Sequence, residues 1–268
     1  MRIIQYQRHG TSFYACDGFS GIAHGFSTRL GGVSPAPWDS MNLGANRGDK
    51  AEHVAENFRR FCFALGTDPQ SLVKNHQVHS DLIRPVTKED ILSAPELPGP
   101  IDADGLVTDV PGVCLTIFSA DCIPVLLYDP RRRVIAAAHA GWRGTARGIA
   151  ARAAETMQRS YGCDPKDILA AIGPGISPCC FETHADVPLG LRAALGAEAE
   201  PFIRPLAQDG KFSVDLKGAN AHWLQKSGLL PEHIAISSAC TACDRSLFWS
   251  HRRQGNTRGS MAAMIQLL

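Results

Sequence analysis

Three stretches of the chain repeat apolar residues at helical spacing. The first begins near Asp49, because Asp49 and Glu52 have the spacing of a capping box. Gly66 stands where a C-terminal cap belongs. Two further helices are predicted at residues 145 to about 161 and 215–228. The apolar positions of the first helix are Val54, Phe58, Phe61, Cys62 and Leu65.

Between these helices lie short apolar runs that are bounded by turn residues, as is typical of buried strands. They are residues 105–108, 113–118, 124–128, 134–139, 168–172 and 234–237. The charged turn at 129–133 predicts a hairpin, so part of the strand pairing is antiparallel. This argues against a purely parallel, doubly wound sheet. The proline-rich stretch 93–100 is interpreted as a loop, so residues 1–268 are predicted to form a single-domain α/β (α+β) sandwich of mixed β-sheets.

Composition excludes several classes of protein. The chain has 268 residues, 44% of them hydrophobic, which excludes wholesale disorder. Lys plus Arg number 27 and Asp plus Glu 26, a balance that does not point to a nucleic-acid partner. No apolar run is long enough for a membrane span, and the N-terminus is too polar for a signal peptide. We therefore expect a cytoplasmic protein whose nine cysteines are mostly reduced and structural.

Three strand ends each carry a side chain that can bind a metal ion. They are His79 in NHQVHS, Cys122 in SADC and His139 in AHAGWRG. Two imidazoles and a thiolate suit zinc or copper and leave a position for water or substrate. Any one of these side chains, taken alone, is more often simply packed or hydrogen-bonded. Their spacing is not a compact signature, so the set remains a hypothesis at this level.

The turn at 141–145 could bind an anion, because it follows a strand, opens a helix and contains two glycines. Arg143 could add a charged guanidinium group to the same site. An ordinary strand-to-helix turn explains the pattern equally well. Asp102 and Asp104 either cap a loop or hold a ligand histidine through a hydrogen bond. Arg252 and its neighbour Arg253 are either solvated or reach a phosphate or carboxylate.

The remaining cysteines give a weaker signal. Cys240 and Cys243 form one C-x-x-C, but no second pair stands at zinc spacing. We therefore interpret them as two core or surface thiols. Cys179 and Cys180 are interpreted as packing residues beside the turn at 173–175.

Taken together, the motifs resemble the laccase-domain family, whose members have been called multicopper polyphenol oxidases, purine nucleoside phosphorylases and peptidoglycan editing factors. The ADC-x-P and HAGWRG pieces, in order after QVH, make the resemblance specific. The matching pieces span nearly the whole chain. They are HGFSTR (24–29), GGVS (31–34), MNLG (41–44), QVH (77–79), ADGLVT (103–108), ADCIPV (120–125), HAGWRG (139–144), IGPGI (172–176) and SHRR (250–253).

The resemblance implies a sandwich with outer helices and a metal triad at His79, Cys122 and His139, usually with zinc and with copper reported. It implies phosphorolysis of adenosine, inosine and methylthioadenosine, and deamination of adenosine. The C-terminal motif departs from the family pattern: His251 replaces a tyrosine, and Thr257-Arg258-Gly259 reverses a Gly-Arg pair. This departure leaves the substrate role of the C-terminal turn open.

The residues can be matched to this chemistry. A metal-bound water suits deamination, with Cys122 and His139 as catalytic as well as metal-binding residues. The candidate substrate-binding residues are Arg29, Asn42, Arg143 and Arg252. Asp104 is the nominee for the proton donor to the leaving purine. The expected partners are a small-molecule nucleoside and phosphate, with no nucleic acid and no membrane, in a monomer or small homo-oligomer.

Three alternatives remain. Cys122 and His139 could be the nucleophile and base of a thiol hydrolase that acts on an amide or a mis-made peptidoglycan precursor. The chain could instead be a metal-binding or partner-binding module without turnover. A polyphenol oxidase (laccase-like) activity would need roughly ten histidine ligands for several coppers. The ten histidines of this chain are scattered singly, which disfavours a copper cluster but leaves one copper at the triad open.

Overall fold

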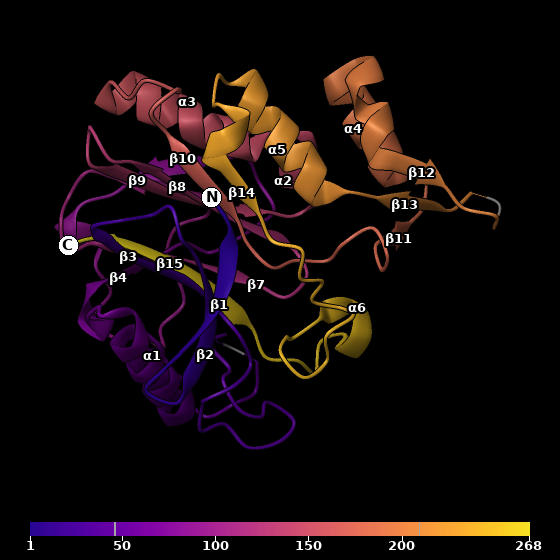
Figure 1. Cartoon of the computed structure of the whole chain (residues 1–268). Coiled ribbons are helices and arrows are strands. Elements are labelled where there is room, and N and C mark those ends of the chain that lie inside the picture. Colours follow the sequence, from indigo (N-terminus) through magenta and orange to yellow (C-terminus); the bar gives the residue numbers. More distant parts are fainter. Residues whose placement is uncertain (46, 209) are drawn as a thin grey trace.

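The computed structural model describes residues 1–45, 47–208 and 210–268. Two six-stranded sheets pack face to face, and helices cover their outer faces (Figure 1). The resulting order of layers is helix, sheet, sheet, helix. The predicted fold class, a layered sandwich of mixed sheets with outer helices, is therefore confirmed.

The first sheet has the strand order β1-β2-β3-β15-β7-β4. All its pairs are antiparallel except β4 with β7. Helix α1 (Ala51–Leu65) covers its outer face. The strands are β1 (Ile3–Arg8), β2 (Thr11–Cys16), β3 (Ile22–Ser27), β4 (Leu72–Lys74), β7 (Cys114–Ser119) and β15 (Met261–Leu267).

The second sheet has the order β14-β10-β8-β9-β6-β5. Its inner pairs β10-β8, β8-β9 and β9-β6 are antiparallel, and its two edge pairs are parallel. The strands are β5 (Ile83–Pro85), β6 (Gly105–Thr108), β8 (Ile123–Asp129), β9 (Val134–Ala140), β10 (Leu169–Ile172) and β14 (Ile234–Ile236). Helices α2 (Trp142–Ala146), α3 (Ile149–Tyr161) and α5 (Leu216–Lys226) pack on its outer side.

Smaller elements complete the molecule. A three-stranded sheet of β11 (Glu182–Thr183), β13 (Phe212–Val214) and β12 (Ile203–Pro205) projects beside α4 (Asp186–Leu195) (Figure 1). Helix α6 (His251–Gln254) precedes β15. The 3₁₀ helices are η1 (Pro69–Ser71), η2 (Lys88–Asp90), η3 (Gly196–Phe202) and η4 (Pro231–His233).

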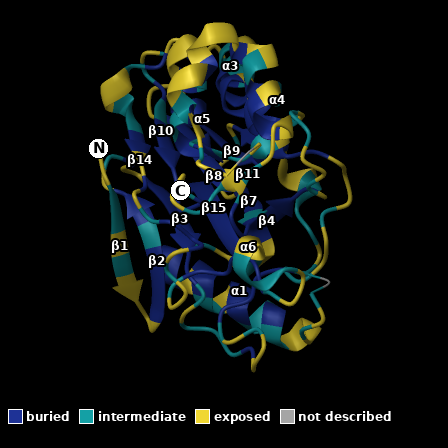
Figure 2. Ribbon diagram, turned by 90° about the vertical axis from the view of Figure 1, so that its right-hand side faces the viewer, coloured by how far each residue is buried: buried dark blue, intermediate teal, exposed yellow. Residues whose placement is uncertain are grey.

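The central strands are buried on both faces, which explains why they appear in the sequence as continuous apolar runs rather than alternating ones. On β8, Val125 and Leu127 face the helices, whereas Leu126 and Tyr128 face the other sheet. Side chains of a strand alternate between its two faces, so one strand supplies two cores. Figure 2 shows the buried strands between outer helices with exposed outer surfaces.

The helix predictions hold in outline and fail in detail. Gly66 ends α1 in the left-handed conformation, as predicted, but Lys50 is the N-cap and Asp49 instead binds Ser34, Asn42 and His53. The single helix predicted after Gly144 is two helices, α2 and α3, because Gly148 has a φ of 74° between them. The third predicted helix is α5.

Each predicted strand is present within about two residues, as β6, β7, β8, β9, β10 and β14. The predicted hairpin joins β8 and β9 in antiparallel register. Within the described part of the chain, no helix is both long and apolar enough to span a bilayer.

Candidate metal centre and its pocket

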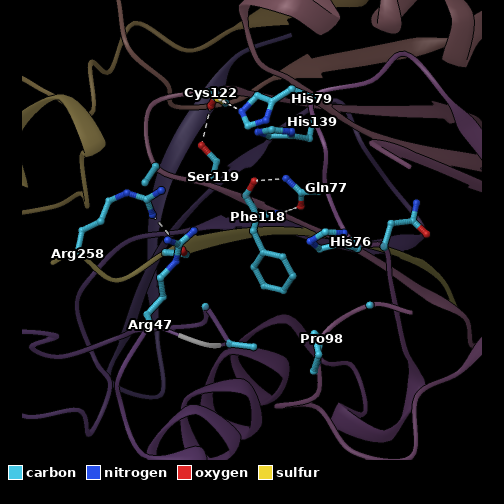
Figure 3. Close-up of a pocket in the computed structure, with 16 residues that line it drawn as sticks. Arg47, His76, Gln77, His79, Pro98, Phe118, Ser119, Cys122, His139 and Arg258 are labelled. Atoms are coloured by element: carbon cyan, nitrogen blue, oxygen red, sulfur yellow. Dashed lines mark hydrogen bonds between the residues drawn. The ribbon is translucent and has the colours of Figure 1, made fainter. Parts of the chain in front are cut away.

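The β8–β9 hairpin brings two of the predicted ligands together. Cys122 immediately precedes β8, and His139 lies near the end of β9, where it pairs with Pro124 across the hairpin. His79 comes from the loop between β4 and β5, and its Nε2 atom is 3.8 Å from the sulfur of Cys122. Donor atoms of all three side chains lie within 4.8 Å of one another. The structure thus assembles the predicted triad (Figure 3).

A single buried carboxylate fixes the loop that carries His79. Asp104, directly before β6, accepts hydrogen bonds from the backbone N–H groups of Val78, His79 and Ser80, at 3.1, 3.1 and 2.6 Å. The Ser80 hydroxyl donates to the same carboxylate at 2.8 Å. These bonds hold His79 at a φ of 59°, a conformation that is uncommon for a residue with a side chain.

Asp104 also orients the second histidine. The Nδ1 atom of His139 donates to Asp104 at 2.8 Å, which leaves Nε2 of His139 free for another partner. Such a carboxylate–histidine pair is the usual support of a histidine that binds metal. Asp104 therefore fills both roles that were considered for it, since it caps the loop that carries His79 and orients His139.

The structure does not support Asp104 as the proton donor to a leaving purine. The side chain is fully buried and its oxygens are occupied by donors. Burial raises the pKa of Asp104, but hydrogen bonds from His139 and Ser80 have the larger, opposite effect and lower the pKa to about 2. A carboxylate with such a pKa carries no proton at neutral pH. Asp104 is therefore a positioning residue.

The electrostatics favour a thiolate beside a charged imidazole. Burial raises the pKa of Cys122, but the neighbouring His139 and His79 lower it, to about 6. Burial lowers the pKa of His139, but Cys122 and Asp104 raise it, to about 9. The thiolate is the form of cysteine that binds metals.

Gly141 allows the three side chains to approach one another. A Cβ atom at this position would lie 2.6 Å from the Cδ2 atom of His79 and 3.2 Å from the sulfur of Cys122. No side chain fits there without displacing a ligand. Together with two imidazoles and one thiolate as donors, this space makes the group suitable for a tetrahedral divalent ion with one open position.

The triad lies at one end of a cavity of about 370 Å³ (Figure 3). This volume is in the range of small-molecule sites. Loops from both sheets line the cavity. The lining residues besides the triad are Gly44, Ala45, Arg47, Asn75, His76, Gln77, Pro98, Gly99, Phe118, Ser119, Ala120, Arg258 and Ser260.

Two arginines of this cavity were not among the predicted substrate residues. Arg47 and Arg258 line the cavity on the left side in Figure 3. Arg258 donates through Nη1 to Gly259 and Ser260, whereas its buried Nε atom has no hydrogen-bond partner among the described residues. Burial and the nearby Arg47 lower the pKa of Arg258 to about 10, so the guanidinium group of Arg258 remains charged at neutral pH. The C-terminal turn, despite its altered order, thus places an arginine at the cavity.

Three further side chains shape the cavity. Gln77 exchanges two hydrogen bonds with the backbone of Phe118, at 2.6 and 2.8 Å, which fixes this wall. The ring of Phe118 points into the cavity (Figure 3). His76 is exposed at the rim, and its Nδ1 atom is 2.7 Å from Asp102.

Two of the predicted substrate residues have structural roles elsewhere. Arg29 lies over the ring of Trp249, at 3.9 Å, and donates to the carbonyl of Asp39. Asn42 is fully buried and accepts from the N–H groups of Gly44 and Ser260, at 2.9 and 3.0 Å. Asn42 therefore positions two cavity-lining segments without lining the cavity itself.

The other two predicted substrate residues also lie outside this cavity. Arg143 is exposed, and its guanidinium lies 4.3 Å from the ring centre of Trp142. Arg252 donates to the carbonyl of Cys180 at 3.1 Å and lines a separate hollow beside β11 and β13. Arg143 stands only four residues after His139, but this short sequence distance does not bring it into the cavity.

The protein is a layered sandwich of two mixed sheets with a cavity whose lining includes a metal-capable group of side chains. A family model described as multi-copper polyphenol oxidoreductase laccase matches residues 23–268. The chain belongs to this family, whose named relatives are enzymes.

Similar proteins bear a second name. The purine nucleoside phosphorylase YlmD of Geobacillus stearothermophilus is 38% identical over 268 residues, covering 98% of this chain and 96% of that protein. The purine nucleoside phosphorylase YfiH of Escherichia coli is 35% identical, covering 92% and 95%. A Bacillus licheniformis crystal structure, titled hypothetical protein YfiH, matches with a TM-score of 0.93 and 35% identity over 98% of this chain and 99% of that one.

Proposed function

We propose that this protein is a metal-dependent purine nucleoside phosphorylase, acting on adenosine, inosine and methylthioadenosine. The observation that carries the proposal is one cavity that is lined by both a metal-capable triad and two arginine side chains. The names of its relatives support the same reaction class.

The guanidinium groups of Arg47 and Arg258 are the proposed phosphate site, in place of Arg143 and Arg252. The unpartnered Nε atom of Arg258 needs an acceptor, since a buried donor without one is unfavourable. A phosphate oxygen would provide it, and a paired guanidinium site suits a dianion.

In phosphorolysis, a phosphate oxygen forms a bond to C1′ of the ribose as the bond between C1′ and N9 of the purine breaks. The electron pair of that bond goes to the purine, which must gain a proton to leave as the neutral base. Phe118 is the proposed platform for the base. His76, oriented by Asp102, is the proposed proton donor to the base, because it is the histidine of the cavity lining that does not belong to the triad.

His79, Cys122 and His139 are the residues that would hold the metal ion, which we propose to be zinc, with copper as the other candidate. When bound, such an ion supplies Lewis acidity and lowers the pKa of water toward neutrality. We include adenosine deamination in the proposal for this reason. The protein's own contribution is to orient the ligands through Asp104 and to leave room for them at Gly141, where a side chain would collide with them.

The test is product analysis by chromatography after incubation of metal-loaded protein with each nucleoside, with and without phosphate. Free base that appears only with phosphate supports phosphorolysis. Inosine formed from adenosine without phosphate supports deamination. Absence of both products with every nucleoside, at full metal content, would overturn the proposal in favour of a binding module.

A second candidate, a thiol hydrolase of peptidoglycan precursors or other amides, rests on a specific arrangement. Asp104 orients His139, and His139 lies beside a thiolate-type Cys122, as in a nucleophile–base–carboxylate triad. The two candidates differ in their response to metal removal. A chelator should abolish the activity of a metal-dependent phosphorylase. It should raise the activity of a thiol hydrolase, because removal of the metal frees the nucleophile Cys122.

The family description raises the question of a copper oxidase. Among the described residues, His79 and His139 are the histidines that belong to a metal-capable group. Two histidines suit one copper ion and not a multicopper cluster. A cytoplasmic location and a monomer or small homo-oligomer remain predictions.

A further inference from the structure

A second group of metal-capable side chains lies outside the cavity. Donor atoms of Cys179, Cys180, Cys240 and Cys243 are all within 4.8 Å of one another. The sulfur of Cys243 is 3.4 Å from that of Cys179 and 3.3 Å from that of Cys180. The sequence interpretation treated Cys240 and Cys243 as core or surface thiols and Cys179 and Cys180 as packing residues, and it did not bring the two pairs together, because the second pair consists of adjacent residues rather than a second C-x-x-C.

The sheet topology brings the two pairs together. β10 and β14 are parallel neighbours, so the chain leaves both strands at the same end (Figure 1). Gly175 and Cys240 then form a parallel bridge beyond these strands. The N–H group of Ser177 donates to the sulfur of Cys240 at 3.3 Å. The group is therefore built by the fold rather than by chance contacts of surface loops.

The spacing of the sulfurs fits one tetrahedral ion. A zinc–sulfur bond of about 2.3 Å places the four sulfurs of a tetrahedral site about 3.8 Å apart. Two of the sulfur–sulfur separations, 3.3 and 3.4 Å, lie below this value, and the limit of 4.8 Å on all of them lies above it. A cluster of several irons requires thiolates that are farther apart.

Burial differs among the four residues in a way that packing does not explain. Cys240 is buried, whereas Cys179 and Cys243 are exposed. Exposed thiols contribute little to a core, but a metal site at a surface has such ligands. The four sulfurs converge although two of their residues are open to solvent.

Cationic side chains surround the group. The buried ammonium of Lys217 donates to Ser177 and to the carbonyls of Ser237 and Ala239, at 2.7–3.0 Å. Arg253 donates to the two carbonyls inside the C-x-x-C, those of Thr241 and Ala242, and Arg252 to that of Cys180. Four thiolates and one divalent ion carry a net charge of −2, which these cations offset.

We propose that Cys179, Cys180, Cys240 and Cys243 bind one zinc ion through four thiolates, as a structural site separate from the His79 triad. All four positions are filled by protein, as in other structural zinc sites. The site fastens the segment after β10 to the segment after β14. Within the C-x-x-C, Thr241 donates to Asp121 at 2.7 Å, and Asp121 directly precedes Cys122. The ion thus supports the segment that carries a triad ligand.

The first experiment uses Cys122→Ala protein, which lacks the triad thiolate and so reports the four-cysteine site alone. The metal-free protein is titrated with Co²⁺ under reducing conditions. We expect one equivalent to bind, with the strong sulfur-to-metal charge transfer and intense visible bands of a tetrahedral tetrathiolate. X-ray absorption of the zinc form should show four sulfurs at about 2.3 Å. A spectrum without these bands at one equivalent would overturn the proposal.

Variants assign the signal to residues. In the same background, Cys243→Ser should reduce the tetrathiolate-bound metal from one ion per chain to nearly none, whereas Cys62→Ser, at a buried cysteine elsewhere, should leave it unchanged. In otherwise wild-type protein, Cys243→Ser should keep the triad metal. In protein with all four cysteines intact, a four-sulfur signal without any metal at the triad would contradict only the function proposed above. Retention of the signal in Cys243→Ser would overturn the present proposal.

A measurement on the unmodified protein does not depend on the folding of variants. Iodoacetamide labelling followed by peptide mapping should show Cys179 and Cys243 protected in the zinc form and alkylated after chelation, although both are exposed. Rapid alkylation of both in protein of full zinc content, or stoichiometric disulfides among the four residues in its place, would contradict the site.

Discussion

The carboxylate of Asp104 lies 2.8 Å from the Nδ1 atom of His139, and both side chains are buried. The same carboxylate accepts from the backbone of His79. One side chain therefore positions two of the three triad ligands, which come from different parts of the chain.

Asp104→Asn should weaken metal binding about 10- to 100-fold, the usual effect of losing a group that orients a metal ligand. The amide cannot accept as many hydrogen bonds from the loop of His79, and it does not favour the same protonation state of the His139 imidazole. Metal affinity is measured by competition with a chelator of known strength. Asp102→Asn, at an exposed pair with His76, is the control and should leave affinity unchanged. Equal affinity in both variants would contradict the positioning role.

Arg258→Gln should raise the KM for phosphate, because the uncharged side chain loses a charge-assisted hydrogen bond worth about 1.5–3 kcal/mol, or roughly ten- to over a hundred-fold. Arg47→Gln should act in the same direction. The measurement is the phosphate dependence of the rate at saturating nucleoside. Arg143→Gln is the matched control, since Arg143 lies outside the cavity. A larger effect in Arg143→Gln than in Arg258→Gln would restore the original assignment.

Gly141→Ala should abolish most metal binding while leaving the fold intact. The new Cβ atom would stand 2.6 Å from the ring of His79, so this ring must move. Metal content is determined by elemental analysis, and folding by the melting temperature of the metal-free protein. Gly190→Ala in helix α4, where the nearest atom to a Cβ is 3.3 Å away, serves as control. A Gly141→Ala protein with full metal content would show that the triad is not the binding site.

Lys74 should make the free energy of unfolding depend on pH in the alkaline range. The residue is buried over the ring of Phe58, and burial lowers its pKa to about 8. Below about pH 8 both the folded and unfolded states hold the proton, and the folded state bears the full penalty of a buried charge. Between about pH 8 and about 10.4 the unfolded state binds more protons, so the stability contributed at this position rises with pH, by about 3 kcal/mol at most.

The comparison of wild type with Lys74→Met isolates this contribution from other titrating groups. Urea unfolding of both proteins is measured from about pH 7 to about pH 10. The wild type should gain stability relative to the variant across this range. A constant difference, or one of opposite sign, would refute the buried, destabilised ammonium.

The sequence predicted those features that depend on local pattern. The central strands were found because burial on both faces produces continuous apolar runs, and the β8–β9 hairpin because its turn is strongly polar. The break at Gly148 was missed, since an isolated glycine does not end a helical pattern. Its cause is tertiary: Gly148 packs against the ring of Trp223 and has a positive φ.

The triad was predicted because each of its residues stands in a recognisable motif, QVH, ADC or HAGWRG. Arg47 was missed because it lies in a loop without periodicity, and Arg258 because its motif is altered. The four cysteines were missed because zinc spacing was sought along the chain, whereas the two pairs meet only through the pairing of β10 and β14. Spacing rules detect sites that lie within one segment, and this one is shared by two.

The position of β15 has a consequence for the order of folding. β15 lies between β3 and β7, although more than 130 residues separate it from either strand. During synthesis on the ribosome, the edges of β3 and β7 that later pair with β15 therefore stay unpaired until residues 261–267 emerge. Unpaired strand edges can lead to aggregation. Arg258 and Ser260, which complete the cavity, arrive in the same step. A nascent chain thus acquires its central sheet and its proposed phosphate site together, so a chaperone that shields those edges would also delay the appearance of activity.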